Sequence, residues 1–247
     1  MKELSDLRLA VLIDADNIPA SSIKGIMEEI ARYGSPTFKR IYGDWTRPNL
    51  SGWKAVLLEN AITPIQQYSY TTGKNSTDSA MIIDAMDILY SGKSDGFCIV
   101  SSDSDFTRLA IRLREAGMRV IGIGEKKTPN AFIVACDKFI YIEIINETPD
   151  KKETKAKAEM PALQKSELIK IISTAINDLA EDDNGWAFLG EVGNLILKKQ
   201  PSFDPRNYGY MKLTPLIKHL NSFEIDERRS AKKNIRLIYI RNKTEVQ

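Results

Sequence analysis

Short apolar runs that end abruptly in acidic residues are the feature that most constrains how this chain can fold. The run Leu9 to Ile13 ends at Asp14, and the run Phe97 to Val100 opens onto the polar stretch SSDSD. Because these runs are continuous rather than alternating, each predicts a strand buried on both faces, as in a parallel sheet. The fold therefore has to accommodate aspartates at the ends of buried strands.

Strand-like and helix-like segments alternate through the first 145 residues. Further strands are expected at residues 36–44, 62–70, 118–124 and 139–145, and helices at 19–33, 51–60, 78–90, 104–116 and 130–135. Strands separated by helices of about ten residues indicate parallel βαβ units. We therefore expect a layered α/β domain with a parallel sheet over residues 1–146.

The second part of the chain differs from the first in composition and charge. Residues 1–150 contain 17 basic and 20 acidic residues, whereas residues 151–247 contain 18 and 13. Between them lies NETPDKKETKAKAEM, which has almost no large apolar residues and predicts a linker at 147–162, or else a frayed helix from Glu153. Beyond it, helical patterns at 163–178, 186–199 and 213–220 precede a terminal hairpin, so residues 163–247 predict a small winged helix-turn-helix domain.

Several classes of protein are disfavoured by what the sequence lacks. It has no apolar run of the ~20 residues that a transmembrane helix requires, and its N-terminus does not resemble a signal peptide, so we expect a cytoplasmic protein without a membrane partner. The single histidine, His219, is distant from Cys98 and Cys136. This scarcity argues against a zinc site and against Ser-His-Asp or Cys-His catalysis. Carboxylates, lysines and the backbone remain as sources of chemistry.

Four aspartates are expected to converge at one edge of the predicted sheet. Asp14 ends the first strand, Asp103 and Asp105 follow the fourth, and Asp78 begins the helix after the third. The carboxyl ends of parallel strands lie along the same edge. Carboxylates in such a cluster would repel one another unless a cation were bound, and Mg²⁺ or Mn²⁺ prefers oxygen ligands. We therefore predict a divalent metal site that could activate water against a phosphodiester.

Other polar residues near this edge are candidates for binding substrate. Asn17 follows Asp14, Ser101 precedes Asp103, and Lys74 lies in a polar loop before Asp78. Ser102 and Ser104 are expected to offer hydroxyls to the same pocket. The helical pattern places Asp84 and Asp87 opposite the apolar face, which favours solvated surface positions. The loop GIGEKKT lacks the spacing of a phosphate-binding loop, but its lysines could hold a nucleic-acid backbone.

Taken together, these motifs resemble the NYN domain, a group within the PIN-like nucleases. The resemblance rests on LIDADN, KNSTDSAMIIDAMD, IVSSDSDF and LREAGMRVIGIG, and it covers roughly residues 7–145. It implies a PIN-like three-layer fold and metal-dependent cleavage of RNA, with Asp14, Asp78, Asp103 and Asp105 as the acidic residues. Asp84 also falls within the second motif. The chain departs from many relatives at Ser102, where they carry glycine.

The C-terminal part is similar to the OST-HTH, or LOTUS, domain, notably in GWAFLGEVGN and FDPRNYGY. This resemblance implies a winged helix that binds RNA or a protein partner. Lysines and arginines there would neutralise phosphates, and two tyrosines, Tyr208 and Tyr210, could stack on bases unless they belong to the core. Trp186 and Phe188 are expected in the core. The basic candidates are Lys198, Lys199, Arg206, Lys212, Lys218, Arg228, Arg229, Lys232 and Lys233.

Three functional hypotheses follow. The leading one is a metal-dependent ribonuclease whose C-terminal domain holds the RNA. The second is an RNA-binding adaptor whose nuclease-like domain is weak or inactive. The third is a small-molecule phosphatase in which Asp14 is the nucleophile, suggested by the DADN sequence at Asp14 to Asn17, which loosely resembles the DxD motif of haloacid-dehalogenase-type phosphatases.

Overall fold

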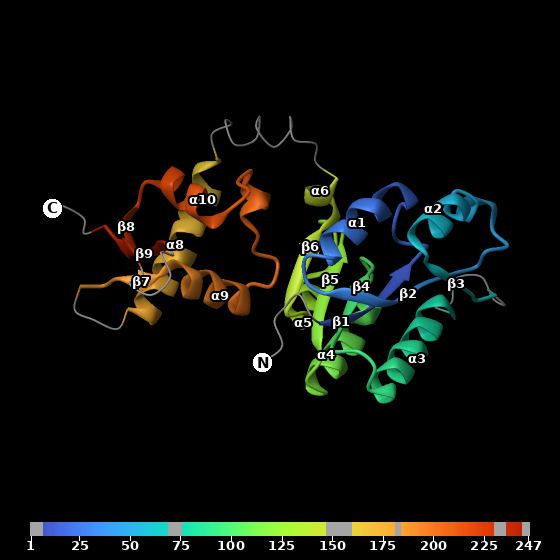
Figure 1. The fold of residues 1–247 in the computed structure, drawn as a ribbon. Coiled ribbons are helices and arrows are strands. Elements are labelled where there is room, and N and C mark those ends of the chain that lie inside the picture. The colour runs from blue at the N-terminus through green and yellow to red at the C-terminus, as the bar shows by residue number, and fades with distance from the viewer. Residues whose placement is uncertain (1–6, 69–75, 147–159, 181–183, 230–235, 244–247) are drawn as a thin grey trace. The chain divides into compact units, whose positions relative to one another are not determined.

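A computed structural model describes residues 7–68, 76–146, 160–180, 184–229 and 236–243 of the chain. The chain divides into two compact units, Met1–Asn146 and Glu147–Gln247 (Figure 1). The described residues include no helix with the length and apolarity needed to cross a membrane.

A six-stranded parallel sheet forms the centre of the first unit, with strand order β3-β2-β1-β4-β5-β6. The chain therefore builds outward from β1 in one direction and then restarts at β4 in the other. This reversal places the carboxyl ends of β1 and β4 side by side, the position at which open α/β sheets form their sites. The strands are β1 Arg8–Asp14, β2 Ser35–Gly43, β3 Thr63–Gln66, β4 Gly96–Val100, β5 Arg119–Gly124 and β6 Lys138–Tyr141.

Helices cover both faces of the sheet, which gives the three-layer α/β architecture expected from the sequence (Figure 1). In β1, Leu9, Val11 and Ile13 pack toward the layer that contains α1 Ile23–Ile30, α2 Trp53–Asn60 and α6 Ile142–Ile145. Ala10 and Leu12 pack toward α3 Ser76–Ser91, α4 Thr107–Glu115 and α5 Asn130–Ala135. Burial on both faces explains why the strand sequences are continuously apolar.

Two strands are shorter than the sequence predicts, because their partner strands end. The strand expected at 62–70 covers only Thr63–Gln66, where Gln66 pairs with Gly43, the last residue of β2; residues 69–70 are outside the described part. The strand expected at 139–145 stops at Tyr141, which pairs with Gly124 at the end of β5. The chain then turns into α6, which buries Ile142 and Ile144 in the core.

The second unit combines three helices with a small antiparallel sheet of order β7-β9-β8. Its core lies between the helices and one face of that sheet. The helix expected at 186–199 is wrong at its start, because Ala187 and Phe188 form strand β7 and the helix begins at Leu189. The elements are α8 Ala162–Leu179, β7 Ala187–Phe188, α9 Leu189–Lys199, α10 Leu213–Leu220, β8 Phe223–Arg229 and β9 Arg236–Asn242.

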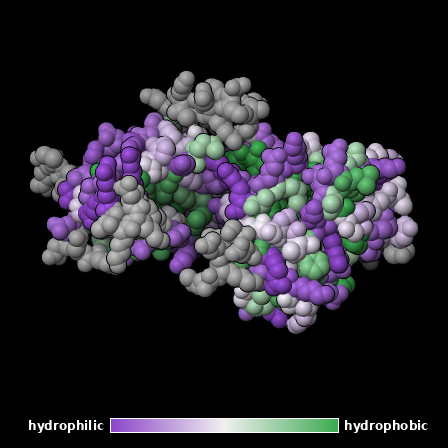
Figure 2. Space-filling view, viewed as in Figure 1, coloured by the Kyte–Doolittle hydropathy of each residue, from purple (hydrophilic) through white to green (hydrophobic). Residues whose placement is uncertain are grey.

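Surface residues of the first unit are mostly polar in the face that Figure 2 shows, with a hydrophobic area near α2, where Leu58 is exposed. The expected linker at 147–162 falls largely on residues 147–159, which are outside the described part of the chain.

Candidate active site at the carboxyl edge of the sheet

Asp14 is a buried carboxylate at the end of the central strand. Its side chain is held from three directions, although the residue is only 1% exposed. The Asn17 amide donates to Oδ2 at 2.6 Å, the Ser101 hydroxyl donates to the same oxygen at 2.8 Å, and the Asp16 backbone N–H donates to Oδ1 at 3.1 Å. These bonds fix the orientation of the carboxylate.

Burial and hydrogen bonding act in opposite directions on Asp14. Desolvation raises the pKa of Asp14, and the bonds from Asn17, Ser101 and the Asp16 backbone lower it, but desolvation is the larger effect. The three donors therefore offset part, but not all, of the cost of placing a charge at the centre of the sheet. Ser101 contributes even though its hydroxyl is fully buried.

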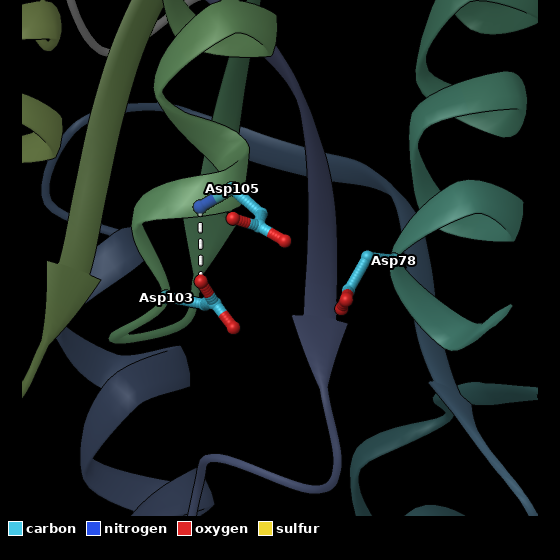
Figure 3. A group of neighbouring side chains, drawn as sticks. All are labelled: Asp78, Asp103 and Asp105. Carbon is cyan, nitrogen blue, oxygen red and sulfur yellow. Dashed lines mark hydrogen bonds between the residues drawn. The ribbon is translucent and has the colours of Figure 1, made fainter. Parts of the chain in front are cut away.

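The turn after β4 uses the same serine to place the next aspartate. The Asp103 backbone N–H donates to the Ser101 Oγ at 3.1 Å, so one hydroxyl links Asp14 to the turn. Asp103 then caps the 3₁₀ turn Ser104–Phe106, because its Oδ1 accepts the Asp105 backbone N–H at 2.9 Å. Helix α4 continues this turn. Capping orients Asp103, and the turn brings Asp105 to the same side (Figure 3).

Asp78, from the first turn of α3, points toward these two aspartates (Figure 3). One carboxylate oxygen from each of Asp78, Asp103 and Asp105 lies within 4.8 Å of the others. Burial and the neighbouring negative charges of Asp14, Asp103, Asp105 and Asp16 raise the pKa of Asp78 to about 6. The cluster therefore concentrates acidic side chains near the buried Asp14.

The donor set fits a hard divalent cation. All three groups offer carboxylate oxygens, which Mg²⁺ and Mn²⁺ prefer, and their spacing allows one ion to contact all three. Asp105 is exposed and the other two are half-buried, so the cluster is accessible from solvent. Asp14, predicted as a fourth ligand, is not part of this three-residue group and is already bonded to Asn17 and Ser101.

The remaining candidate residues of the first unit lie in different environments. Ser102 accepts the Glu125 backbone N–H at 2.9 Å, so it ties the turn to the end of β5. The expectation that Asp84 is a solvated surface residue is wrong, because its Oδ2 accepts from Arg40 at 2.7 Å and from the Tyr42 hydroxyl at 2.9 Å. Asp87 is exposed. Lys74 lies outside the described residues.

The basic candidates in the second unit occupy different environments. Lys198 and Lys199 are exposed at the end of α9, with Lys199 paired to Asp178. Arg206, predicted to bind substrate, is buried instead, and its guanidinium donates to the Asp204 carboxylate at 2.7 and 2.9 Å. That pair stabilises the turn Pro205–Tyr208, so Arg206 is a structural residue. Lys232 and Lys233 are outside the described residues.

Two aromatic residues of the second unit take the core alternative that the sequence left open, and two do not lie in the core as expected. Tyr208 and Tyr210, the stacking candidates, pack against the core, where Tyr208 contacts Phe203 and Tyr210 contacts His219. Trp186 and Phe188, which were expected in the core, are half-buried and lie outside it. The outward position of Trp186 and Phe188 could not be predicted, because a two-residue strand is too short to show alternation in the sequence.

Comparisons with known proteins agree with this division of the chain. A family model described as NYN domain matches residues 8–143, and one described as OST-HTH/LOTUS domain matches residues 159–235. No curated protein matches the chain.

Among solved structures, the chain is similar to a protein of unknown function from Vibrio parahaemolyticus, at 18% identity over 57% of this chain and 96% of that one, with a TM-score of 0.48. It is also similar to an uncharacterized protein from Nitrosomonas europaea, at 33% identity over 41% of this chain and 86% of that one, with a TM-score of 0.30.

Proposed function

The chain belongs to the NYN domain family, with an OST-HTH/LOTUS domain after the NYN domain, and from this premise we propose that it is a metal-dependent ribonuclease. In this proposal Asp78, Asp103 and Asp105 bind Mg²⁺ or Mn²⁺, Asp14 completes the acidic site, and the second unit holds the RNA. The NYN domain lies within the PIN-like nuclease superfamily, so the premise and the proposed chemistry agree.

The acidic cluster is the observation that carries the proposal. Three carboxylates from two remote segments reach within 4.8 Å of one another, and burial together with the neighbouring negative charges raises the pKa of Asp78 to about 6. Repulsion among carboxylates at this distance lowers the stability of the folded protein unless a cation is bound. Capping accounts for one oxygen of Asp103, but it does not by itself bring the Asp78 carboxylate to those of Asp103 and Asp105.

A bound divalent ion would supply charge neutralisation, polarisation of a phosphodiester and a lower pKa for a nearby water. The chain's own residues perform the positioning. Asn17 and Ser101 hold Asp14 in one orientation, and Ser101 also fixes the backbone of Asp103. Because β1 and β4 are adjacent paired strands, the sheet would hold Asp14 and the turn of Asp103 in place before substrate binds.

The second unit would supply affinity for the polyanion. Exposed lysines at the end of α9 can neutralise phosphates, which releases counterions and makes binding sensitive to salt. This part of the proposal assigns RNA as the partner, with Lys198 and Lys199 as phosphate contacts. Lys74, which precedes Asp78 in the sequence, is proposed as a further phosphate contact.

A comparison of Asp103→Asn with Asp87→Asn tests the proposal. Asparagine can still accept the Asp105 N–H, so the variant keeps the turn but loses a carboxylate. Labelled single-stranded and hairpin RNAs would be incubated with Mn²⁺ or with EDTA. We expect cleavage only with the metal, a loss of at least about 100-fold in Asp103→Asn, and no change in Asp87→Asn, since even outer partners of metal ligands are worth about 10–100-fold.

Unchanged cleavage in Asp103→Asn would refute the site assignment. RNA binding without any metal-dependent cleavage would instead favour the adaptor hypothesis, in which the nuclease-like domain is inactive. The phosphatase hypothesis is disfavoured by geometry, because both oxygens of Asp14 accept hydrogen bonds and the residue is 1% exposed, which leaves it poorly placed to attack a phosphomonoester.

A further inference from the structure

The outer face of the small sheet in the second unit carries aromatic and arginine side chains. In β8 and β9, Ile225, Ile238 and Ile240 point into the core, so the residues that alternate with them point to the opposite face. The β7 residue Ala187 is likewise buried, which puts its two neighbours in the sequence on the outer face. The outer residues are Trp186, Phe188, Glu224, Asp226, Arg228, Leu237, Tyr239 and Arg241.

Three rings, those of Trp186, Phe188 and Tyr239, form the aromatic part of this outer face. Phe188 pairs in register with Tyr239, and their ring centroids are 5.7 Å apart. Gly190 allows Phe188 to lie close to the start of α9, because a Cβ at that position would be 2.7 Å from the ring. All three rings are half-buried, so each keeps part of its surface in contact with solvent.

Two guanidinium groups lie over these rings. The Arg228 Cζ is 4.1 Å from the Tyr239 centroid and 5.7 Å from that of Trp186, and the Arg241 Cζ is 4.8 Å from the Trp186 centroid. Asp226 accepts from Arg228 at 2.7 Å, and Glu224 accepts from Arg241 at 2.7 and 2.9 Å. Because Asp226 and Glu224 bind the edges of the two guanidinium groups, the flat faces of these groups are available for stacking. The Arg228 side chain remains 46% exposed.

Packing alone does not account for this arrangement. The domain core is complete without these rings, since the buried cluster of the second unit contains none of them. Cation–π contacts do stabilise the hairpin, but they leave flat, partly exposed surfaces side by side. Such surfaces fit a planar, π-rich ligand. On this face Arg228 and Arg241 are balanced by Glu224 and Asp226, so the flat rings and guanidinium planes, rather than net charge, select the ligand.

We propose that unpaired bases of single-stranded RNA stack on this face, with Trp186, Tyr239 and Arg228 as the stacking surface. The inference rests on the proposed function, because it names the form of RNA that the second unit holds. Stacking is tolerant of sequence, since every base has a π-face.

Binding can be measured in the full chain carrying Asp103→Asn, in EDTA, so that cleavage does not interfere. Fluorescence anisotropy would follow a labelled 10-nucleotide single-stranded RNA of mixed sequence. Tyr239→Leu and Trp186→Leu should each weaken binding roughly ten-fold. Tyr239→Phe keeps the ring and should bind like the parent. Tyr90→Leu, an exposed tyrosine of α3, provides a matched control and should have no effect.

Two further oligonucleotides identify what is recognised. An abasic ribose-phosphate of equal length should bind the parent and Tyr239→Leu equally, because it offers nothing to stack. A blunt RNA duplex should also fail to discriminate them. The salt dependence of binding to the mixed RNA should be the same for both proteins, since no phosphate contact is removed. Circular dichroism and thermal unfolding would confirm that each variant is folded.

An unchanged Kd in folded Tyr239→Leu and Trp186→Leu would overturn the inference and leave the proposed function intact. An equal loss of affinity for the abasic strand would also overturn it, because the residues would then serve the backbone or the fold. If the parent bound no RNA at all, the RNA-binding part of the proposed function would fail with it. If the parent protein bound no RNA, this face could instead bind a protein partner.

Discussion

Replacing Asp78 with asparagine should make the metal-free protein more stable. In the folded state burial and the neighbouring aspartates raise the pKa of Asp78 from 3.8 to about 6. Between about pH 4 and pH 6 the folded protein retains a proton that the unfolded chain has lost. The free energy of unfolding therefore falls as pH rises through this window, and the full penalty is present above about pH 6.

The size of the gain follows from the shift and its environment. One pKa unit corresponds to about 1.4 kcal/mol, so the rise to about 6 corresponds to about 3 kcal/mol at neutral pH. Because Asp78 is only half-buried, solvent screening reduces this to about 1–2 kcal/mol. Asparagine also loses the favourable interaction of a carboxylate with the start of α3, about 0.3–1 kcal/mol. We expect a net gain of about 1 kcal/mol, or about 3 °C in Tm.

Urea unfolding at pH 7.5 and pH 4, in EDTA, would measure this gain. Two of the three tryptophans, Trp45 and Trp53, lie in the first unit, so a Trp186→Phe background makes fluorescence report on that unit. The gain should be present at pH 7.5 and mostly absent at pH 4. Asp87→Asn, an exposed aspartate of the same helix, provides the control and should change stability by less than about 0.5 kcal/mol.

Adding Mn²⁺ should reverse the order of stability. Binding at 100-fold excess over Kd stabilises a protein by about 2.7 kcal/mol, and this applies to the variant only as far as it still binds the ion. The parent should thus become the more stable protein. The reasoning is refuted if Asp78→Asn is no more stable than the parent in EDTA at pH 7.5, or if it stays the more stable of the two in saturating Mn²⁺.

Three further substitutions test how the fold supports the site. Ser101→Ala removes a hydrogen bond to the buried Asp14 carboxylate, and we expect a loss of about 1–3 kcal/mol in urea unfolding together with slower RNA cleavage. Gly124→Ala places a Cβ 2.5 Å from the Ser101 carbonyl oxygen, so it should cost about 1–3 kcal/mol and reduce cleavage; wild-type activity would show that the strand end can shift freely. Asp84→Asn weakens an ion pair with Arg40 and should lower Tm while cleavage by the folded protein stays near the parent rate; a cleavage loss as large as that of Asp103→Asn would place Asp84 in the site.

The proximity of three of the four aspartates could be predicted from the sequence because a simple rule governs it. Buried parallel strands are recognisable from continuous apolar runs, and their carboxyl ends must meet at one edge, which brings Asp78, Asp103 and Asp105 together. The role of Ser101 was less legible. A serine directly after a strand is expected to expose its hydroxyl to a ligand. Only the pairing of β1 with β4 shows that the Ser101 hydroxyl is buried against Asp14.

Other residues were misplaced because their environment depends on neighbours that are remote in the chain. Asp84 has a polar position on its own helix, but β2 supplies Arg40 and Tyr42 to bind it. Trp186 and Phe188 read as core residues because large aromatics usually are. Their outward position follows from the register of β7 against β9, which a two-residue strand does not reveal in sequence.

The wide separation of the aspartates along the chain has a consequence for folding kinetics. Asp14, Asp78 and Asp103 become neighbours only when β1, α3 and the end of β4 are all in place, so their repulsion is absent from the unfolded chain. We expect the close approach of these side chains to be completed after the rate-limiting step, as for interactions with φ near 0. Relief of the repulsion, by substitution or by a cation, should then slow unfolding and leave the folding rate nearly unchanged. The acidic site would therefore control the unfolding rate of the first unit, which would be slow only when a cation or a substitution removes the repulsion among the aspartates.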